Sequence, residues 1–239
     1  SPRIAGVSAR FALTFHFSLF TPHQLPSGIS GKAPGVYADD PLDIRCDVLH
    51  LNTERAMRGG EIQTLGLIQG LRSRGVRCTL VAREGAPLLA RARTEGVLGI
   101  PWRPRGELDG VAAFRLRRWV VASGAQVVHA HTAHALGLAL LALAGMKFRP
   151  RVVASRRVSF PLRSALSRWK YRRADAVVAV SGEIRQGLLA QGLGENRVWT
   201  IHSGVDLTRF ESLPSRSRAR ERFGIPAGAM VVGAVGALV

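Results

Sequence analysis

Short apolar segments alternate with longer amphipathic ones along most of this chain. The short segments are rich in valine and other apolar residues, which is typical of strands buried on both faces of a sheet. In the longer segments apolar residues recur every three or four positions, which predicts helices. The expected strands are 46–51, 76–82, 97–100, 126–129, 151–154, 176–180 and 198–201, and the expected helices are 61–75, 87–94, 108–122, 132–144, 162–171 and 183–190.

This alternation predicts an α/β fold: a doubly wound, mainly parallel, Rossmann-like sheet with helices on both faces. Pro101 is expected to end the third strand. The Pro- and Gly-rich start predicts a disordered or loosely attached extension. The expected divisions are this extension at 1–43, the Rossmann-like domain at 44–210, a linker with a short helix at 211–228, and the first strand of a further domain at 229–239.

The chain has 239 residues and a formal net charge of +18, almost all of it from arginine. Such a balance favours anionic partners, namely nucleic acid, acidic phospholipid or phosphorylated small molecules, although a solvated basic surface gives the same composition. Cys46 and Cys78 have no metal-site or disulfide spacing, which suggests a reducing, cytoplasmic setting. The longest apolar stretch, 135–146, falls short of the ~20 residues that span a bilayer.

A glycine pair separates the first expected strand from the first expected helix. Gly59, Gly60 and Glu61 follow Arg58. Backbone amides at a helix start, approached closely because glycine has no side chain, suit a phosphate or a sugar hydroxyl, although the same residues also form a plain tight turn. The spacing is not that of a dinucleotide-binding fingerprint.

Histidines lie at the end of the strand at 126–129. His129 and His131 share a face of an extended chain, and His131 is nearer the carboxyl edge, where ligands bind in such sheets. His131 is therefore a candidate acid, base or hydrogen-bonding group, whereas His129 fits a satisfied core position better. The same H-x-H pattern opens many metal-dependent hydrolases, but the chain after His134 holds only His202 as a further histidine, so no metal site is expected.

Two arginines, Arg156 and Arg157, follow the strand at 151–154. Guanidinium groups pair with phosphate in fork geometry, so both are candidates for phosphate or acceptor binding. The basic helix at 162–171 suits either an anionic membrane surface or a solvated face. A specific nucleic-acid module is disfavoured, because the basic segments lack interleaved aromatic residues and a binding motif.

Four segments in this order resemble the N-terminal half of a family 4 glycosyltransferase of the two-domain GT-B fold. The resemblance extends over about 47–239. One departure is Ser155-Arg156-Arg157, where many relatives have a histidine. The four segments are Arg58 to Glu61, VVHAH at Val127 to His131, ADAVVAVS at Ala174 to Ser181, and VWTIHSGVDLTRF at Val198 to Phe210.

The resemblance implies retaining transfer of a sugar from a nucleotide-sugar donor, which is a substrate and not a cofactor, to a lipid-linked or cell-envelope saccharide, as in lipopolysaccharide or polysaccharide biosynthesis. The glycine turn would lie close to the donor phosphates and His131 in the cleft wall. The donor would be gripped mainly by a second domain with an E-x7-E pair, so this chain is expected to be an inactive fragment. We expect a cytoplasmic protein, peripheral on the inner membrane face. The candidate cleft or hinge residues are His202, Ser203, Gly204 and Asp206.

Overall fold

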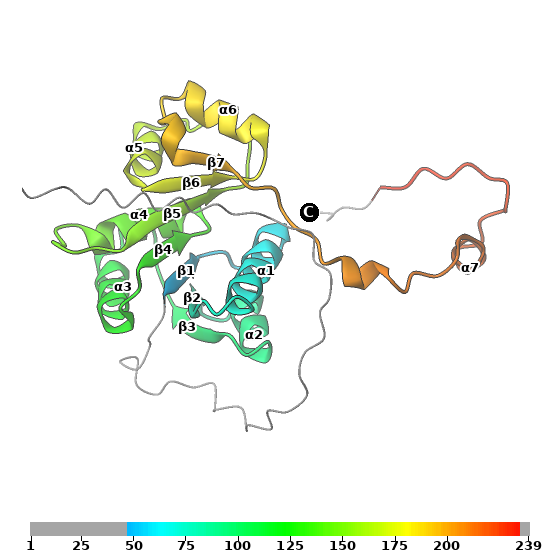
Figure 1. Cartoon of the computed structure of the whole chain (residues 1–239), viewed down its shortest axis with the longest axis horizontal. Coiled ribbons are helices and arrows are strands. Elements are labelled where there is room, and N and C mark those ends of the chain that lie inside the picture. The colour runs from blue at the N-terminus through cyan, green and yellow to red at the C-terminus, as the bar shows by residue number, and fades with distance from the viewer. Residues whose placement is uncertain (1–46, 235–239) are drawn as a thin grey trace, which may run out of the picture. The chain divides into compact units, whose positions relative to one another are not determined.

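The computed structural model describes residues 47–234, so the predicted extension at 1–43 lies outside the described residues. Its centre is a seven-stranded sheet in the order β3-β2-β1-β4-β5-β6-β7, and every neighbouring pair of strands is parallel (Figure 1). The predicted α/β Rossmann-like fold is confirmed. The strands are β1 (Val48–Asn52), β2 (Cys78–Arg83), β3 (Leu98–Trp102), β4 (Val127–Ala130), β5 (Arg151–Arg156), β6 (Ala176–Ala179) and β7 (Val198–Thr200).

Helices cover the sheet from both sides. Two of them, α1 and α2, pack through Ile68 and Leu88 on one face, whereas α3 to α6 contribute to a separate core on the other face. This division follows from right-handed crossovers, because the chain moves from β1 toward β3 and then returns through β4 toward β7. The helices are α1 (Gly59–Arg72), α2 (Pro87–Thr94), α3 (Gly110–Ser123), α4 (Ala133–Leu143), α5 (Ala165–Arg173), α6 (Gly182–Ala190) and α7 (Arg216–Arg222).

Side-chain caps set the starts of helices α3, α4, α5 and α6. Asp109, Thr132, Ser164 and Ser181 each accept a hydrogen bond from a backbone amide in the first turn of the helix that follows. Because these caps lie at the carboxyl ends of the strands, they also fix the loops at the edge where ligands bind in doubly wound sheets.

Pro101 does not end β3, contrary to the sequence-based expectation. The strand continues to Trp102, whose side chain is 2% exposed and donates its indole N–H to the carbonyl of Ala112. Proline is tolerated here because β3 is the edge strand of the sheet, so a missing amide donor can face away from the ladder.

After β7 the chain continues through a short 3-10 helix at Leu207–Phe210 and then α7, which buries no residue. The strand expected at 229–239 is not formed by 230–234, where Met230 and Val232 are almost fully exposed, and 235–239 lie outside the described residues. A strand needs a neighbour to satisfy its backbone groups, and nothing pairs with this segment among residues 47–234. None of the described helices has the length and apolarity that crossing a membrane would require.

Candidate functional site

The direction of strand order reverses between β1 and β4, and the candidate residues gather at the carboxyl end of this junction. Such a switch point is where open α/β sheets bind their ligands, because the loops on its two sides diverge. The loop after β1 is tied to the loop after β4 by a 2.7 Å hydrogen bond between the hydroxyls of Thr53 and Thr132. The two loops therefore form one surface.

Three buried histidines form a layer beneath this surface, named here the histidine layer: His50, His129 and His131. His50 is fully buried, and the other two are at most 8% exposed. The rings of His129 and His131 stack with centroids 4.1 Å apart, and His50 Nδ1 lies 3.0 Å from His131 Nε2. His129 Nε2 lies 2.9 Å from the hydroxyl of Ser155, which confirms that it is a satisfied core histidine.

The contact with Arg157 determines which ring nitrogens of His131 and His50 carry a proton. Its guanidinium lies 3.2 Å from His131 Nδ1 and, because guanidinium only donates, that nitrogen must accept. The proton of neutral His131 is then on Nε2, which donates to His50 Nδ1. His50 in turn carries its proton on Nε2, a buried atom with no hydrogen-bond partner within residues 47–234.

Burial keeps all three imidazoles neutral. Desolvation lowers the pKa of His50 to about 3. Desolvation, neighbouring histidines and Arg157 together lower the pKa values of His129 and His131 well below the ordinary histidine value. Charging any one of them would place a cation in a closed, already positive environment.

The histidine layer is also the group of described residues that could hold a metal ion, since its ligand atoms lie within 4.8 Å of one another. Its hydrogen bonds argue against that use. His131 is engaged through both nitrogens, His129 is engaged with Ser155, and the guanidinium of Arg157 would repel a divalent cation. The geometry favours a hydrogen-bonded layer over a metal centre.

The sequence predicted that the glycine pair lies in the loop before the first helix. In the structure the pair is part of helix α1 itself. Gly59 and Gly60 are its first two residues, and the first amides of a helix have no partner within it. A Cβ at Gly59 would meet nothing within 4 Å, and one at Gly60 would lie 3.7 Å from Arg157 Cδ. No structural contact requires glycine at position 59, so its small size leaves the helix start open to a ligand.

Glu61 lies inside the protein. Its carboxylate accepts from the side-chain amide of Asn52 at 3.1 Å and from the backbone amide of Arg58 at 3.1 Å, and it is only 4% exposed. It ties the start of α1 to the end of β1. We therefore assign it a positioning role for the glycine pair and not a contact with a ligand.

Arg156 and Arg157 point to opposite faces of the sheet, so they do not form the joint phosphate clamp that their adjacency suggested. Successive side chains alternate along a strand, and β5 ends at Arg156. Arg157 faces Gly60 and His131, whereas Arg156 lies over the ring of Tyr171 at 5.6 Å and donates to the carbonyl of Phe160. Of the two arginines, only Arg157 lies beside the glycine pair.

The expected hinge segment after β7 also reaches this edge. The side-chain amide of Gln63 in α1 donates to the carbonyl of Gly204 at 2.8 Å. His202 and Ser203 are exposed, and Asp206 caps the following 3-10 helix by accepting from the amide of Thr208 at 3.1 Å. Gly204 therefore contacts the helix that carries the glycine pair, whereas Asp206 has a local structural role.

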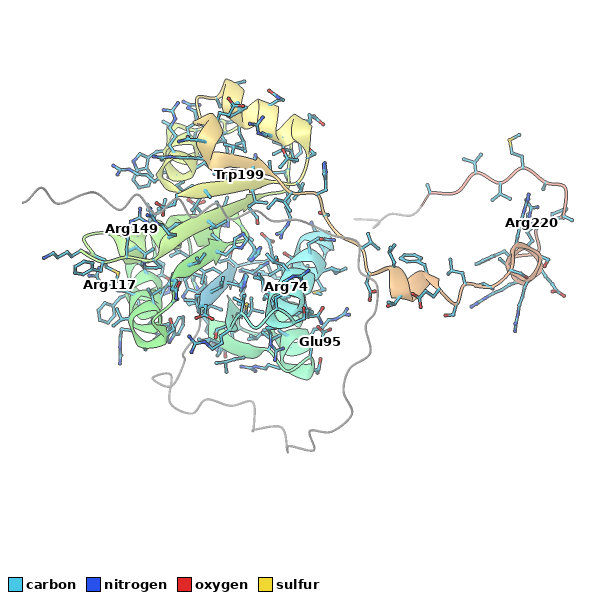
Figure 2. The ribbon with its side chains drawn as sticks, viewed as in Figure 1. Arg74, Glu95, Arg117, Arg149, Trp199 and Arg220 are labelled. Carbon is cyan, nitrogen blue, oxygen red and sulfur yellow. The ribbon has the colours of Figure 1, made fainter. Side chains whose placement is uncertain are left out.

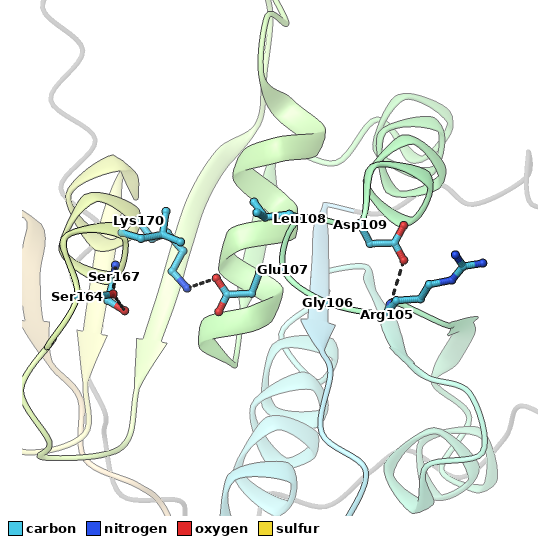
Figure 3. A pocket seen from close by; sticks show the side chains of 9 residues that line it. Arg105, Gly106, Glu107, Leu108, Asp109, Ser164, Ser167 and Lys170 are labelled. Atoms are coloured by element: carbon cyan, nitrogen blue, oxygen red, sulfur yellow. Dashed lines mark hydrogen bonds and ion pairs between the residues drawn. The ribbon is translucent and has the colours of Figure 1, made fainter.

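A pocket of about 680 Å³ lies between the loop before α3 and helix α5. At its base Lys170, 3% exposed, donates to Glu107 at 2.6 Å and to the carbonyl of Ala133 at 3.3 Å (Figure 3). His134 completes the cluster, 3.4 Å from Glu107. A second hollow of about 510 Å³ adjoins it through the shared Ser164 and Ser167.

Sequence reasoning missed both His50 and the pair of Glu107 and Lys170. His50 interrupts an otherwise apolar strand, a polar position that could have marked it. Its partner depends on β1 pairing with β4, which is not local in sequence. Glu107 and Lys170 are far apart along the chain, and no local sequence pattern near either residue predicts their contact.

The family model for Glycosyltransferase Family 4 matches residues 57–209 of this chain. No curated protein matches closely enough to count as a relative. The family match gives no support to a metal-dependent hydrolase built on His129 and His131.

Solved structures share the fold at low sequence identity. HepE from Anabaena, crystallised with UDP-glucose, is 16% identical with a TM-score of 0.62, covering 75% of this chain and 50% of HepE. A glycosyltransferase from Rickettsia africae is 17% identical with a TM-score of 0.62, covering 77% and 51%. The lipopolysaccharide outer core galactosyltransferase WaaB is 12% identical with a TM-score of 0.54, covering 67% and 46%. The chain thus spans about half the length of these proteins.

Proposed function

The chain belongs to glycosyltransferase family 4, and from that premise we propose that it is the N-terminal, acceptor-side half of a retaining glycosyltransferase. The reaction would move a sugar from a nucleotide-sugar donor to a cell-envelope saccharide or lipid-linked acceptor. One observation carries the assignment: the matched region contains the start of α1 and the loops after β4, β5 and β7, and contacts among Gly60, His131, Arg157, Gln63 and Gly204 bring them to one edge.

The arrangement suits a phosphate better than an acid or base. The helix start at Gly59 and Gly60 offers amides and the positive end of a helix dipole, and Arg157 adds a guanidinium beside them. His131 holds that guanidinium through its ring nitrogen and its carbonyl. We therefore propose that Arg157 contacts the donor phosphates and that His131, predicted as catalytic, positions it from the cleft wall.

The pocket between the loop before α3 and helix α5 gives room for an acceptor. It combines the Ser164 and Ser167 hydroxyls with the neutralised pair of Glu107 and Lys170, and such groups can hydrogen-bond a saccharide. HepE was solved with UDP-glucose, and WaaB is described as a galactosyltransferase, which supports a nucleotide-sugar partner in general. The proposal includes no resident cofactor and no specific nucleic acid. It also includes a cytoplasmic, membrane-peripheral location.

A transfer assay on the product of the longest reading frame that contains this chain tests the proposal. The protein is incubated with a panel of nucleotide sugars and with membrane extract as the acceptor source, and labelled product is followed and its anomeric configuration read by NMR. We expect transfer with retention. The variant Arg157→Met should lose at least about tenfold in rate, since charge-assisted hydrogen bonds to phosphate are lost.

The matched control is Arg91→Met in α2, which removes a guanidinium that is exposed and outside the glycine edge. Equal losses in both variants would contradict the role of Arg157. An inverted product would contradict the retaining mechanism, and failure with every nucleotide sugar would contradict the transferase itself.

A further inference from the structure

Helix α3 presents an apolar stripe to the outside. Val111, Phe114 and Val121 are each more than 60% exposed, and Arg115 and Arg118 lie between them. These positions follow a helical spacing and therefore share one face. The opposite face buries Leu116 and Val120 in the core, so no described residue covers the stripe.

Helix α5 repeats the pattern. Leu166 and Trp169 are nearly half exposed, and the guanidinium of Arg173 lies 5.8 Å from the ring of Trp169. Phe160, in the loop before the helix, is 70% exposed, and Arg163 follows it. Contrary to the expectation that the basic segments lack aromatic residues, Phe160 and Trp169 lie among arginines here. Such a mixture of apolar side chains and arginine is typical of helices that lie at a lipid interface.

The two stripes belong to the same side of the sheet and meet at the acceptor pocket. Both helices contribute to the core on that side, and α4 packs between them. Leu108, 78% exposed and just before α3, lines the pocket together with Leu166 of α5. The pocket therefore opens between the apolar ends of the two stripes.

The charges of this surface favour an anionic occupant. Arg105, Arg115, Arg118 and Arg163 are exposed. The nearby acids are engaged elsewhere: Glu107 pairs with Lys170, and Asp109 caps α3 by accepting from the amide of Ala112 at 3.0 Å. A second copy of the chain would bring like charges together, whereas an anionic lipid surface would complement these cations.

We propose that the outer faces of α3 and α5, together with Leu108 and Phe160, dock on a bilayer rich in anionic phospholipid. The apolar side chains would enter the interface while the arginines pair with lipid phosphates. The pocket would then open at the membrane surface, where a lipid-linked saccharide could reach it. That last step rests on the proposed function, whereas the docking itself does not.

Flotation with phosphatidylcholine vesicles, with and without phosphatidylglycerol, tests the docking in the absence of donor and acceptor. We expect binding only with phosphatidylglycerol, weakened by salt. The charge reversal Arg118→Glu and the paired change Phe114→Ser with Val121→Ser should each lower vesicle affinity about tenfold. The controls are Arg91→Glu in α2 and Ile62→Ser in α1, both exposed on the other side of the sheet.

Tryptophan quenching by brominated lipid gives an independent readout. Quenching should fall in Trp169→Phe and be unchanged in Trp199→Phe, because Trp199 of β7, labelled in Figure 2, is 57% exposed on the face of the sheet opposite to α3 and α5. All variants change exposed residues, and their unfolding temperatures serve as the check on folding.

Four results would overturn the proposal. They are no binding to phosphatidylglycerol, equal losses in the control variants, quenching that depends on Trp199, and stripe variants that alter oligomeric state instead of vesicle binding. Because docking is measured without substrates, it can fail while sugar transfer to a water-soluble acceptor persists, and transfer can fail while docking persists.

Discussion

At Gly59 the requirements of folding and of function can be separated. A Cβ there would meet nothing within 4 Å, and the residue has ordinary helical conformation. We expect Gly59→Ala to leave the free energy of unfolding unchanged or to raise it by up to about 1 kcal/mol, because alanine favours helix. Nucleotide-sugar binding by the product of the longest reading frame that contains this chain should nevertheless weaken, because a methyl group would then stand at the proposed phosphate position.

The matched control is Gly66→Ala in the same helix, where a Cβ also meets open space. Both variants are compared by urea unfolding and by calorimetric titration with UDP-sugars. Equal nucleotide-sugar affinities for the two variants would show that the start of α1 does not approach the phosphates.

The proton positions of His131 give a second residue-level prediction. With Arg157 donating to Nδ1, nitrogen NMR of labelled imidazole should show His131 protonated on Nε2 alone. In Arg157→Ala the pKa of His131 should rise but stay below its ordinary value, because desolvation by burial is the main cause of the depression and only one nearby cation is removed. Arg156→Ala should leave the His131 signals unchanged, since Arg156 faces Tyr171. A doubly protonated His131 in the unmodified protein at neutral pH would contradict this assignment.

The sequence predicted that most candidate residues lie at the carboxyl edge of the sheet, and the structure agrees. It did not predict toward which face of the sheet each side chain points. Period-two alternation places His129 and His131 on one face, and the structure agrees. The same alternation separates Arg156 from Arg157, although their adjacency suggested a pair. The inward direction of Glu61 depends on Asn52 at the end of β1, a tertiary contact that no local pattern reports.

Among the elements, β1 and the end of β4 carry the histidine layer. The contribution of this layer to the free energy of unfolding depends on pH. The pKa values of His50, His129 and His131 in the folded protein lie below the unfolded value near 6.5. At a pH between the folded and the unfolded pKa values, the unfolded chain therefore binds more protons than the folded protein. Stability from this source is complete above about pH 7 and is lost as pH falls through 6.5. Each histidine contributes up to about 1.4 kcal/mol per pH unit in that window.

Urea unfolding between pH 8 and pH 4.5 measures this dependence. We expect a plateau at the alkaline end and a steep decline below about pH 6, shallower by roughly a third in His129→Asn, which removes one titrating group. A free energy of unfolding that stays constant down to pH 5 would contradict neutral, buried imidazoles. Hydrogen bonds are the main cause of the depressed pKa values of Asp47 and Asp109. These two groups change the free energy of unfolding only below the ordinary aspartate value of 3.8, which lies outside the pH range of this measurement.

Element types followed from sequence because each is amphipathic or apolar over its own length, whereas strand order is a property of the whole sheet. Pro101 illustrates the difference. Its ring predicts the end of a strand, but β3 lies at the edge, where a missing donor is harmless. The contact of Lys170 with Glu107 likewise requires α5 to lie beside the loop before α3, which only the assembled fold determines.

For the whole molecule, the contacts at the carboxyl edge belong to one wall of the proposed binding site. Gly60, Arg157 and Gly204 converge there. The solved relatives are about twice as long as the portion matched by this chain, and HepE was crystallised with UDP-glucose. On the proposed function most donor contacts belong to a second domain, so we expect this wall to have little affinity of its own.

We therefore expect residues 1–239 to bind nucleotide sugars no tighter than millimolar, because one phosphate contact and a helix start supply only about 4 kcal/mol. The product of the longest reading frame that contains this chain should bind at least about a hundredfold more tightly if it includes a domain with the E-x7-E pair. Calorimetric titration of both proteins with the same panel of UDP-sugars measures the difference. Equal affinities would locate the donor site within the described sheet, and Gly59→Ala in the shorter chain would then show whether it lies at the glycine pair.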